Sequence, residues 1–203
     1  MEHERKEKGK KPIALPVTLA LLVLSLIGNV FLYSKFLQHG QDRKYDKGQE
    51  VGHAAADTAS FYTAALKGIA ALKESRSQED RAAAKFELGR AYGAYADGAS
   101  RFVQLGRSLK QPEANADDIY RIMAEDEQRL SSLGNHEGPL TEDELAVLDS
   151  FQNRYTAELD IIRKFNFDAA GIRSSSIRLG AGFDWPEIAE ELEGAILQAG
   201  SAQ

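Results

Sequence analysis

The sequence contains no cysteine and only five prolines among its 203 residues. A chain without cysteine has no disulfide, no thiolate nucleophile and no cysteine-ligated metal site. Because a domain of about 150 residues buries a sufficient core without disulfides, this absence does not indicate a compartment. The composition, 43% hydrophobic and 28% charged, is typical of a folded chain rather than a disordered one.

Strand patterns are also missing, because no stretch shows the polar–apolar alternation typical of a half-buried strand. Basic residues are scarce in the distal part, where residues 51–203 carry 16 Lys and Arg against 25 Asp and Glu. Such an acidic surface repels phosphate backbones, and the sequence shows no basic patch. We therefore expect no nucleic-acid partner.

The sequence contains only one long hydrophobic run, at residues 12–34, and these residues carry no charge. Its apolar centre, residues 13–33, would span about 31 Å as a helix, which matches a bilayer core of about 30 Å. The run is apolar all round, whereas a core helix of a soluble domain would show a polar face. The sequence predicts a single-pass transmembrane helix whose partner is the lipid bilayer.

The alternative for this run is a cleaved signal peptide, which usually has a shorter apolar core followed closely by a small-x-small cleavage site. The sequence NVFLYSKFLQHGQDRK contains no such site, and the first candidate, near Ala54 and Ala56, lies about twenty residues too late. We therefore interpret residues 12–34 as an uncleaved signal anchor, with Tyr33 and Phe36 at the outer interface.

The charges that flank this run predict its orientation. Residues 1–11 contain five Lys and Arg, and residues 35–50 contain four, most of them farther from the run. Because cationic flanks tend to remain in the cytoplasm, we expect a cytoplasmic N-terminus and an extracytoplasmic distal domain in the cell membrane. A cytoplasmic distal domain is the alternative.

Helical periodicity beyond the run predicts helices over residues 38–75, 79–109, 116–133, 142–162 and 185–203. Ser77 with Asp80, and Thr141 with Glu144, have the spacing of capping boxes. The predicted fold is all-α: one N-terminal transmembrane helix followed by an antiparallel helical bundle of about four main helices plus a C-terminal amphipathic helix.

The same patterns divide the chain into segments. We expect a short basic cytoplasmic tail at 1–11, the transmembrane signal anchor at 12–34, a juxtamembrane stalk at 35–52, the helical bundle at 53–165, a Ser/Gly-rich loop at 166–184 and the C-terminal helix at 185–203. The stalk is predicted to be weakly helical because Gly48 and Gly52 continue the line of the apolar stripe. The C-terminal helix, which Asp184 can cap, either docks on the bundle or remains a tethered segment.

The second predicted helix has a regular seam and three glycines beside it. The seam residues keep a three–four spacing typical of helical bundles: Tyr92, Tyr95, Ala99, Phe102, Gly106 and Leu109. Gly89, Gly93 and Gly98 lie off this seam and indicate a close backbone approach or a bend. The two tyrosines of the seam are interpreted as core residues rather than as the lining of a ligand cavity.

Candidate chemistry is sparse. His53 and Asp57 share a helical face, but a metal site needs at least three ligands. The acidic runs at 125–127, 142–144 and 190–193 point in several directions, so we interpret the first as a solvated face and the second as a helix start. The serines at 174–176 lack a G-x-S-x-G context, and the sequence at 180–182 lacks that of a phosphate loop. We therefore predict no catalytic residue, no metal site and no cofactor.

The order of segments also resembles a known family. An N-terminal anchor, helices containing Ala and Tyr, and a helix that opens with PLTEDEL, a PL-x-x-x-E pattern, are similar to the N-terminal part of the YpeB family of spore-germination accessory proteins. The resemblance covers about the first 165 residues and includes no diagnostic motif. The repeated C-terminal domains of that family do not follow.

These observations predict a membrane-anchored, non-enzymatic interaction or scaffolding module of the cell envelope with a protein partner. The alternative is an extracytoplasmic small-molecule sensor. Because the tail at 1–11 is short for an output domain, such a sensor would signal through a partner protein. An enzyme is the third and least supported class.

Overall fold

A computed structural model describes residues 14–201, and all regular structure in this range is helical, without strands. This confirms the predicted all-α class. The chain divides into two compact units, Met1–Asp42 and Arg43–Gln203. Helix α1 (Ala14–Glu74) contributes residues to both units, and the units are described separately below. The expected basic tail at 1–11 lies outside the described residues.

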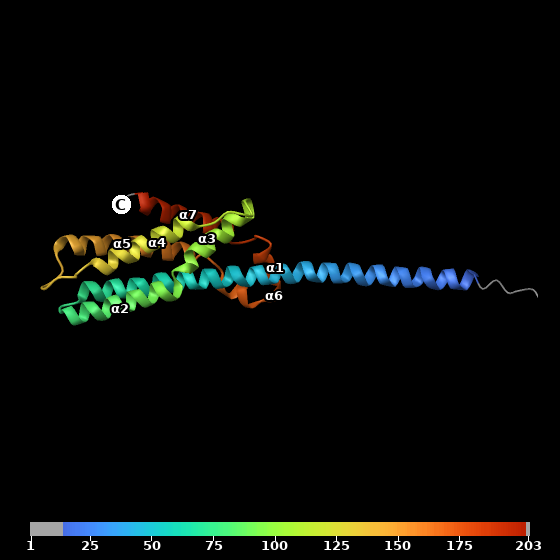
Figure 1. The fold of residues 1–203 in the computed structure, drawn as a ribbon, viewed down its shortest axis with the longest axis horizontal. Coiled ribbons are helices and arrows are strands. Elements are labelled where there is room, and N and C mark those ends of the chain that lie inside the picture. Colours follow the sequence, from blue (N-terminus) through green and yellow to red (C-terminus); the bar gives the residue numbers. More distant parts are fainter. Residues whose placement is uncertain (1–13, 202–203) are drawn as a thin grey trace, which may run out of the picture. The chain divides into compact units, whose positions relative to one another are not determined.

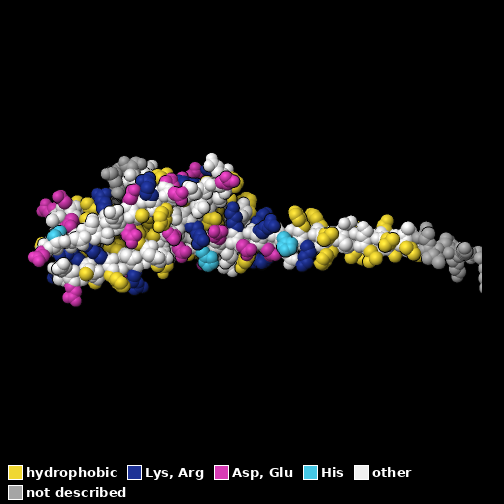
Figure 2. All heavy atoms as spheres, viewed as in Figure 1, with side chains coloured by type: hydrophobic (Ala, Val, Ile, Leu, Met, Phe, Trp, Pro, Cys, Tyr) yellow, Lys and Arg dark blue, Asp and Glu magenta, His cyan; other side chains and the backbone are white. Residues whose placement is uncertain are grey.

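The first unit consists, in its described part, of apolar helix with its side chains exposed. An 18-residue window of this helix has a mean hydropathy of 2.1, and none of the window is buried. Figure 2 shows hydrophobic side chains spread over its surface. Among the described residues, this is the one helix that is long and apolar enough to cross a membrane.

The second unit places six further α-helices around a shared core, as Figure 1 shows. They are α2 (Gln78–Tyr95), α3 (Asp97–Lys110), α4 (Asp117–Ser132), α5 (Glu142–Ile162), α6 (Arg173–Gly180) and α7 (Pro186–Ser201), with a short 3₁₀ helix, η1 (Phe167–Gly171). Helix α7 packs against α3, α4 and α5, and α2 packs against α3 and α4. The C-terminal helix is therefore docked rather than tethered.

Both predicted capping boxes are present and explain where two helices begin. The Asp80 N–H donates to Ser77 Oγ at 3.0 Å, and the Ser77 N–H donates to Asp80 Oδ2 at 3.1 Å. At α5 the Glu144 N–H donates to Thr141 Oγ1 at 3.2 Å, and the Thr141 N–H donates to Glu144 Oε2 at 2.9 Å. Each pair satisfies N–H groups that have no partner within the helix.

The prediction of a single helix over residues 79–109 is wrong, because the helix is interrupted at Ala96, between α2 and α3. The predicted continuous seam of core residues is wrong as well. Tyr92 and Phe102 are buried, whereas Tyr95 is 38% exposed. A Cβ at Gly98 would lie 2.7 Å from the Thr58 nitrogen, so α3 begins in close contact with α1. The predicted close approach therefore holds for this glycine and not for Gly89 or Gly93, which have open space around them.

The prediction of a Ser/Gly-rich loop at 166–184 is also wrong, because this segment contains η1 and α6. Figure 1 shows α6 beside the part of α1 that follows Arg43. Cβ atoms at Gly48 or Gly180 would overlap the carbonyl oxygens of Ser176 and Lys44 respectively. Gly48, one of the two glycines expected to weaken a stalk, instead lets the backbones of α1 and α6 touch, and residues from Arg43 onward belong to the folded second unit.

Asp184 does not cap the last helix. Helix α7 begins at Pro186, so the preceding Trp185 carbonyl accepts the Ala189 N–H at 3.2 Å. Asp184 adopts a positive φ of 73°, and its carboxylate accepts N–H groups from Arg178 Nε at 3.2 Å and Nη2 at 2.9 Å. Proline at the first helical position provides the fixed φ that a helix start needs.

Candidate functional site

The most unusual feature of the second unit is a set of ionisable side chains inside its core. Four helices supply it, and we call it the tyrosine–carboxylate cluster: Tyr62 of α1, Tyr92 of α2, Asp126 of α4, and Arg154, Tyr155 and Glu158 of α5. Asp126 is 1% exposed and Glu158 is 2% exposed. Carboxylates are almost never buried so deeply without partners, so their contacts define what the cluster can do.

Hydrogen bonds connect most of the cluster across three helices. The Tyr92 and Tyr155 hydroxyls lie 2.5 Å apart, and the Tyr155 hydroxyl donates to Asp126 Oδ2 at 3.3 Å. Arg154 Nη2 forms an ion pair with the same carboxylate oxygen. The Arg154 Nε lies 3.8 Å from Glu158 Oε1, a longer ion pair. The guanidinium of Arg154 therefore forms ion pairs with two buried carboxylates.

Aromatic rings enclose these polar groups. The Arg154 guanidinium lies 4.8 Å from the ring centres of both Phe151 and Tyr155. Phe61 packs edge-on against Tyr62 and Tyr92, with ring centres 5.1 and 4.9 Å apart. Aromatic faces attract a guanidinium and exclude water, so they both hold the cation and strengthen its ion pairs.

The charge of the cluster balances only when Glu158 carries a proton. Burial raises the pKa of Glu158 from 4.5 to about 7, while Arg154 partly opposes the rise. Burial, followed by the charge of Glu158, also raises the pKa of Tyr62. The Tyr62 hydroxyl and Glu158 Oε2 form no well-aligned hydrogen bond, but the two side chains are close enough that Tyr62 lowers the pKa of Glu158. Protonated Glu158 leaves the Asp126–Arg154 pair neutral, whereas ionised Glu158 adds an unbalanced negative charge.

The cluster is closed to a substrate. A cavity of about 40 Å³ reaches Tyr92 but is not lined by Asp126 or Glu158. General acid–base catalysis requires a catalytic group within hydrogen-bond reach of the reacting atom. Because both carboxylates are almost fully buried, the geometry favours a structural role in fixing the register of four helices.

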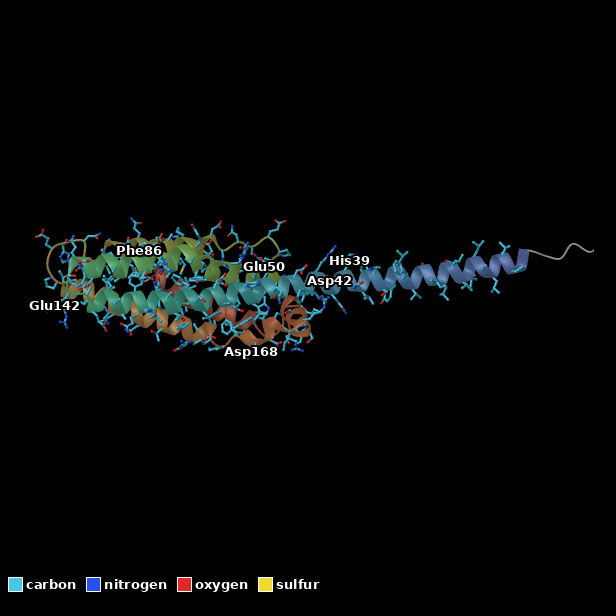
Figure 3. The ribbon with its side chains drawn as sticks, turned by 90° about the horizontal axis from the view of Figure 1, so that it is seen from below. His39, Asp42, Glu50, Phe86, Glu142 and Asp168 are labelled. Atoms are coloured by element: carbon cyan, nitrogen blue, oxygen red, sulfur yellow. The ribbon has the colours of Figure 1, made fainter. Side chains whose placement is uncertain are left out.

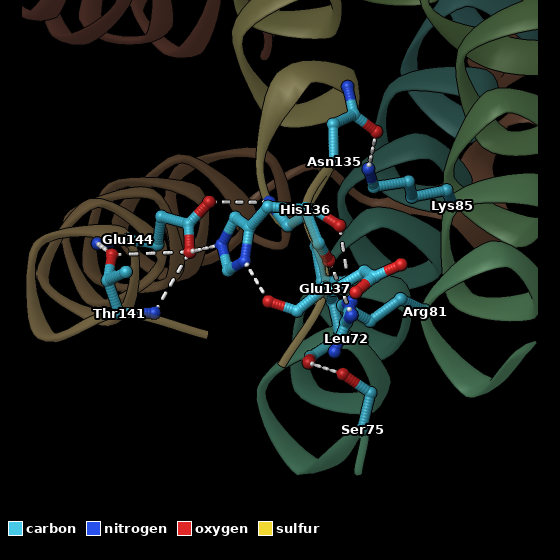
Figure 4. A network of polar contacts seen from close by, with 10 residues as sticks. Leu72, Ser75, Arg81, Lys85, Asn135, His136, Glu137, Thr141 and Glu144 are labelled. Carbon is cyan, nitrogen blue, oxygen red and sulfur yellow. Dashed lines mark hydrogen bonds and ion pairs between the residues drawn. The ribbon is translucent and has the colours of Figure 1, made fainter. Parts of the chain in front are cut away.

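A second polar network joins the start of α2 to the loop before α5 (Figure 4). Buried Arg81 donates from Nε to the Gly134 carbonyl at 3.2 Å and from Nη2 to the His136 carbonyl at 3.0 Å. Glu144 lies 2.8 Å from His136 Nε2 and accepts the Gly134 N–H at 2.6 Å. Burial opposes the effect, but these hydrogen bonds and that of Thr141 lower the pKa of Glu144 to about 2.

A surface depression of about 840 Å³ lies between α3, α7 and the start of α4. Its central cation, Arg107, is already engaged: Nε donates to Glu193, Nη1 to Asp118 and the Asn115 carbonyl, and Nη2 to both carboxylates. All five N–H groups of the guanidinium therefore have acceptors within the protein. This depression offers no unpaired guanidinium N–H to an anionic ligand.

A second depression of about 680 Å³ runs between α1 and α2, and we call it the α1–α2 groove. Small side chains from both helices line much of it: Ala64, Gly68 and Ala71 of α1, and Ala83 and Ala84 of α2. Lys67 and Glu87 also line the groove. Small residues let another element approach two helix backbones closely, so this surface can accommodate part of a partner protein.

The structure does not gather the residues that the sequence singled out. His53 is exposed on α1, and residues 14–201 contain no group of three or more His, Asp or Glu side chains that could hold a metal ion. Ser176 is buried against α1, where it accepts the Gln49 amide at 2.8 Å. Tyr92 lies in the core as predicted, but Tyr95 lines a surface depression of about 390 Å³.

The prediction of a solvated acidic face at 125–127 is wrong at its middle residue, because Asp126 is buried. Glu158 was missed as well. Both occupy the apolar line of their helix: Asp126 follows Ile119 and Met123, and Glu158 follows Tyr155 at a spacing of three. A carboxylate on a core-facing line is therefore the sequence signal that indicates this cluster.

The sequence matches no known family model, and no curated protein or solved structure matches it. The similarity of layout to the YpeB family is thus not supported by a match.

Proposed function

We propose that the protein is a single-pass membrane protein whose helical bundle is an extracytoplasmic, non-enzymatic interaction module of the cell envelope. The observation that carries the proposal is the exposed apolar helix of the first unit, with a mean hydropathy of 2.1 and no buried side chain in its window. Water cannot solvate such a surface favourably, whereas a bilayer core can.

Two features of the second unit support an interaction module over an enzyme. The buried titratable groups are closed to solvent, and Arg107 in the depression between α3 and α7 is paired internally with Asp118 and Glu193. The α1–α2 groove, by contrast, is open, and its lining combines small side chains with five charged ones, at Lys67, Glu74, Arg76, Asp80 and Glu87. A protein partner that binds this groove would explain why the folded domain has an open groove but no accessible catalytic group.

The small-molecule sensor is the weaker candidate. Tyr92 is hydrogen-bonded to Tyr155 inside the core, so it does not line a ligand cavity of useful size. A sensor would require a metabolite that stabilises the folded protein in a thermal-shift screen. Reproducible stabilisation by one metabolite class would favour that function instead.

Sidedness can be tested with single cysteines, because the chain has none. In a Glu142→Cys variant the new thiol lies at the exposed start of α5, and in a His3→Cys variant it lies in the basic tail. A membrane-impermeant maleimide should label the first variant in intact cells and the second only after permeabilisation. The reverse pattern would place the domain in the cytoplasm.

The partner surface can be tested by filling the α1–α2 groove. Ala71 is exposed and lines the groove, whereas Ala82 is exposed on α2 and does not line it. Ala71→Trp should remove a crosslinked complex that forms in native membranes, and Ala82→Trp should leave it unchanged. If the complex survives Ala71→Trp, the groove is not the binding surface.

A further inference from the structure

Exposed apolar side chains of the second unit concentrate near α6. Outside the first unit, the described residues expose seven large hydrophobic side chains: Phe86, Tyr95, Leu109, Tyr120, Phe167, Ile172 and Phe183. Three of the seven lie between residues 167 and 183, although this segment is a small part of the unit. Exposed aromatic and aliphatic side chains in one segment are typical of an interaction surface.

The same region is basic in an otherwise acidic unit. We define the α6 surface as residues 43–48 of α1 together with residues 167–184. Its cations are Arg43, Lys44, Lys47, Arg173 and Arg178, and its carboxylates are Asp46, Asp168 and Asp184. Residues 51–203 as a whole carry 16 cations and 25 carboxylates, so positive charge is locally enriched here.

The two parts of the α6 surface are held together by direct contacts. The glycine pair Gly48 and Gly180 brings the backbones together, and the Arg173 guanidinium lies 4.9 Å from the Tyr45 ring centre. Arg178 lies 5.7 Å from the ring centre of exposed Phe183. Arg178 beside exposed Phe183 combines a cation and apolar surface in one place, as proteins at membrane interfaces do.

The chain itself limits how far this surface can lie from a bilayer. Only residues 35–42 separate the uncharged run at 12–34 from Arg43. Even a fully extended segment of this length spans only about 30 Å. An anchored chain therefore keeps the α6 surface at a high effective concentration near lipid headgroups.

We propose that the α6 surface binds the headgroup and outer acyl region of the bilayer that anchors the chain, with a preference for anionic lipid. This inference rests on the proposed membrane anchor. Ile172 and Phe183 enter the outer acyl region, and Arg43, Lys44 and Lys47 face lipid phosphates. The contact would hold the second unit against the membrane, while Glu142, which lies far from Asp168 within the second unit (Figure 3), stays in water.

The test uses the full chain in vesicles of phosphatidylcholine and phosphatidylglycerol with a nitroxide quencher on the outer acyl chain. A fluorophore on Ser174→Cys, an exposed residue of α6, reports the surface, and one on Glu142→Cys serves as the matched control. Quenching at Ser174→Cys should exceed the control several-fold. Adding Ile172→Ser and Phe183→Ser, both exposed positions, should abolish the excess without unfolding the domain.

Three outcomes contradict the inference in different ways. Equal quenching at both labels, in protein that resists alkaline carbonate extraction, overturns the α6 surface and leaves the anchor intact. Protein that carbonate extracts from the vesicles overturns both proposals. Excess quenching that persists unchanged in pure phosphatidylcholine overturns the preference for anionic lipid.

Discussion

At the scale of single residues, Glu158 decides how stability depends on pH. Its pKa is about 7 in the folded protein against 4.5 without burial, and the ionisable groups that act on it are Arg154, Tyr62 and Asp126. The folded state therefore holds this proton more tightly than the unfolded state. As pH rises from 4.5 to 7, the free energy of unfolding should fall by up to about 3 kcal/mol.

Glu158→Gln keeps the shape of the side chain and removes its charge. Urea unfolding in detergent micelles should show that the variant is more stable than the wild type at pH 8 and similar at pH 5. Asp160→Asn, which removes an exposed carboxylate from the same helix, should preserve the wild-type pH dependence. A wild-type stability that does not change between pH 5 and 8 would contradict the buried charge balance.

The sequence predicts part of this residue-scale account. The capping pairs Ser77–Asp80 and Thr141–Glu144 were found because a cap depends on residues three positions apart. The tyrosine–carboxylate cluster was not, because Asp126 of α4 meets Arg154 of α5, 28 residues away, only after the helices pack. The positions of Asp126 and Glu158 on apolar lines were visible, and so was Arg154 four residues before Glu158 on the same helix, but the pairing of Arg154 with Asp126 was not.

At the scale of elements, glycine has opposite effects that depend on its neighbours. Gly48 touches the α6 backbone, whereas Gly89 of α2 faces open space. Gly48→Ala should force α6 away from α1 and cost about 1–3 kcal/mol, as overpacking does. Gly89→Ala should stabilise α2 by up to about 1 kcal/mol, because alanine favours helix.

Hydrogen exchange with thermal unfolding measures both effects. In Gly48→Ala, the amides of residues 173–180 should exchange faster than in the wild type while those of α5 remain protected. In Gly89→Ala, α6 should keep its protection. Unchanged exchange in α6 after Gly48→Ala would show that the glycine pair does not hold this helix.

Element boundaries could be predicted where local signals act alone. The start of α5 follows from its cap, and the apolar face of α4 follows from its spacing. The break at Ala96 and helix α6 could not be predicted, because both depend on contacts with α1 that are distant in sequence. Serines and glycines at 174–182 have low helix propensity, and packing on Gly48 overrides it.

At the scale of the whole molecule, the two units differ in what surrounds their apolar side chains. In the second unit a shared core buries them, whereas the described helix of the first unit exposes them along its length. A bilayer would remove this apolar area from water. The proposed extracytoplasmic location, the proposed partner binding in the α1–α2 groove and the proposed lipid binding of the α6 surface therefore all depend on membrane anchoring.

The most direct test of this premise is the intact mass of the protein that remains in membranes after alkaline carbonate washing. The account predicts the full chain of 22.3 kDa in the membrane pellet, with residues 12–34 retained. A polypeptide that has lost residues 1–34, or protein recovered only in the carbonate supernatant, would contradict it.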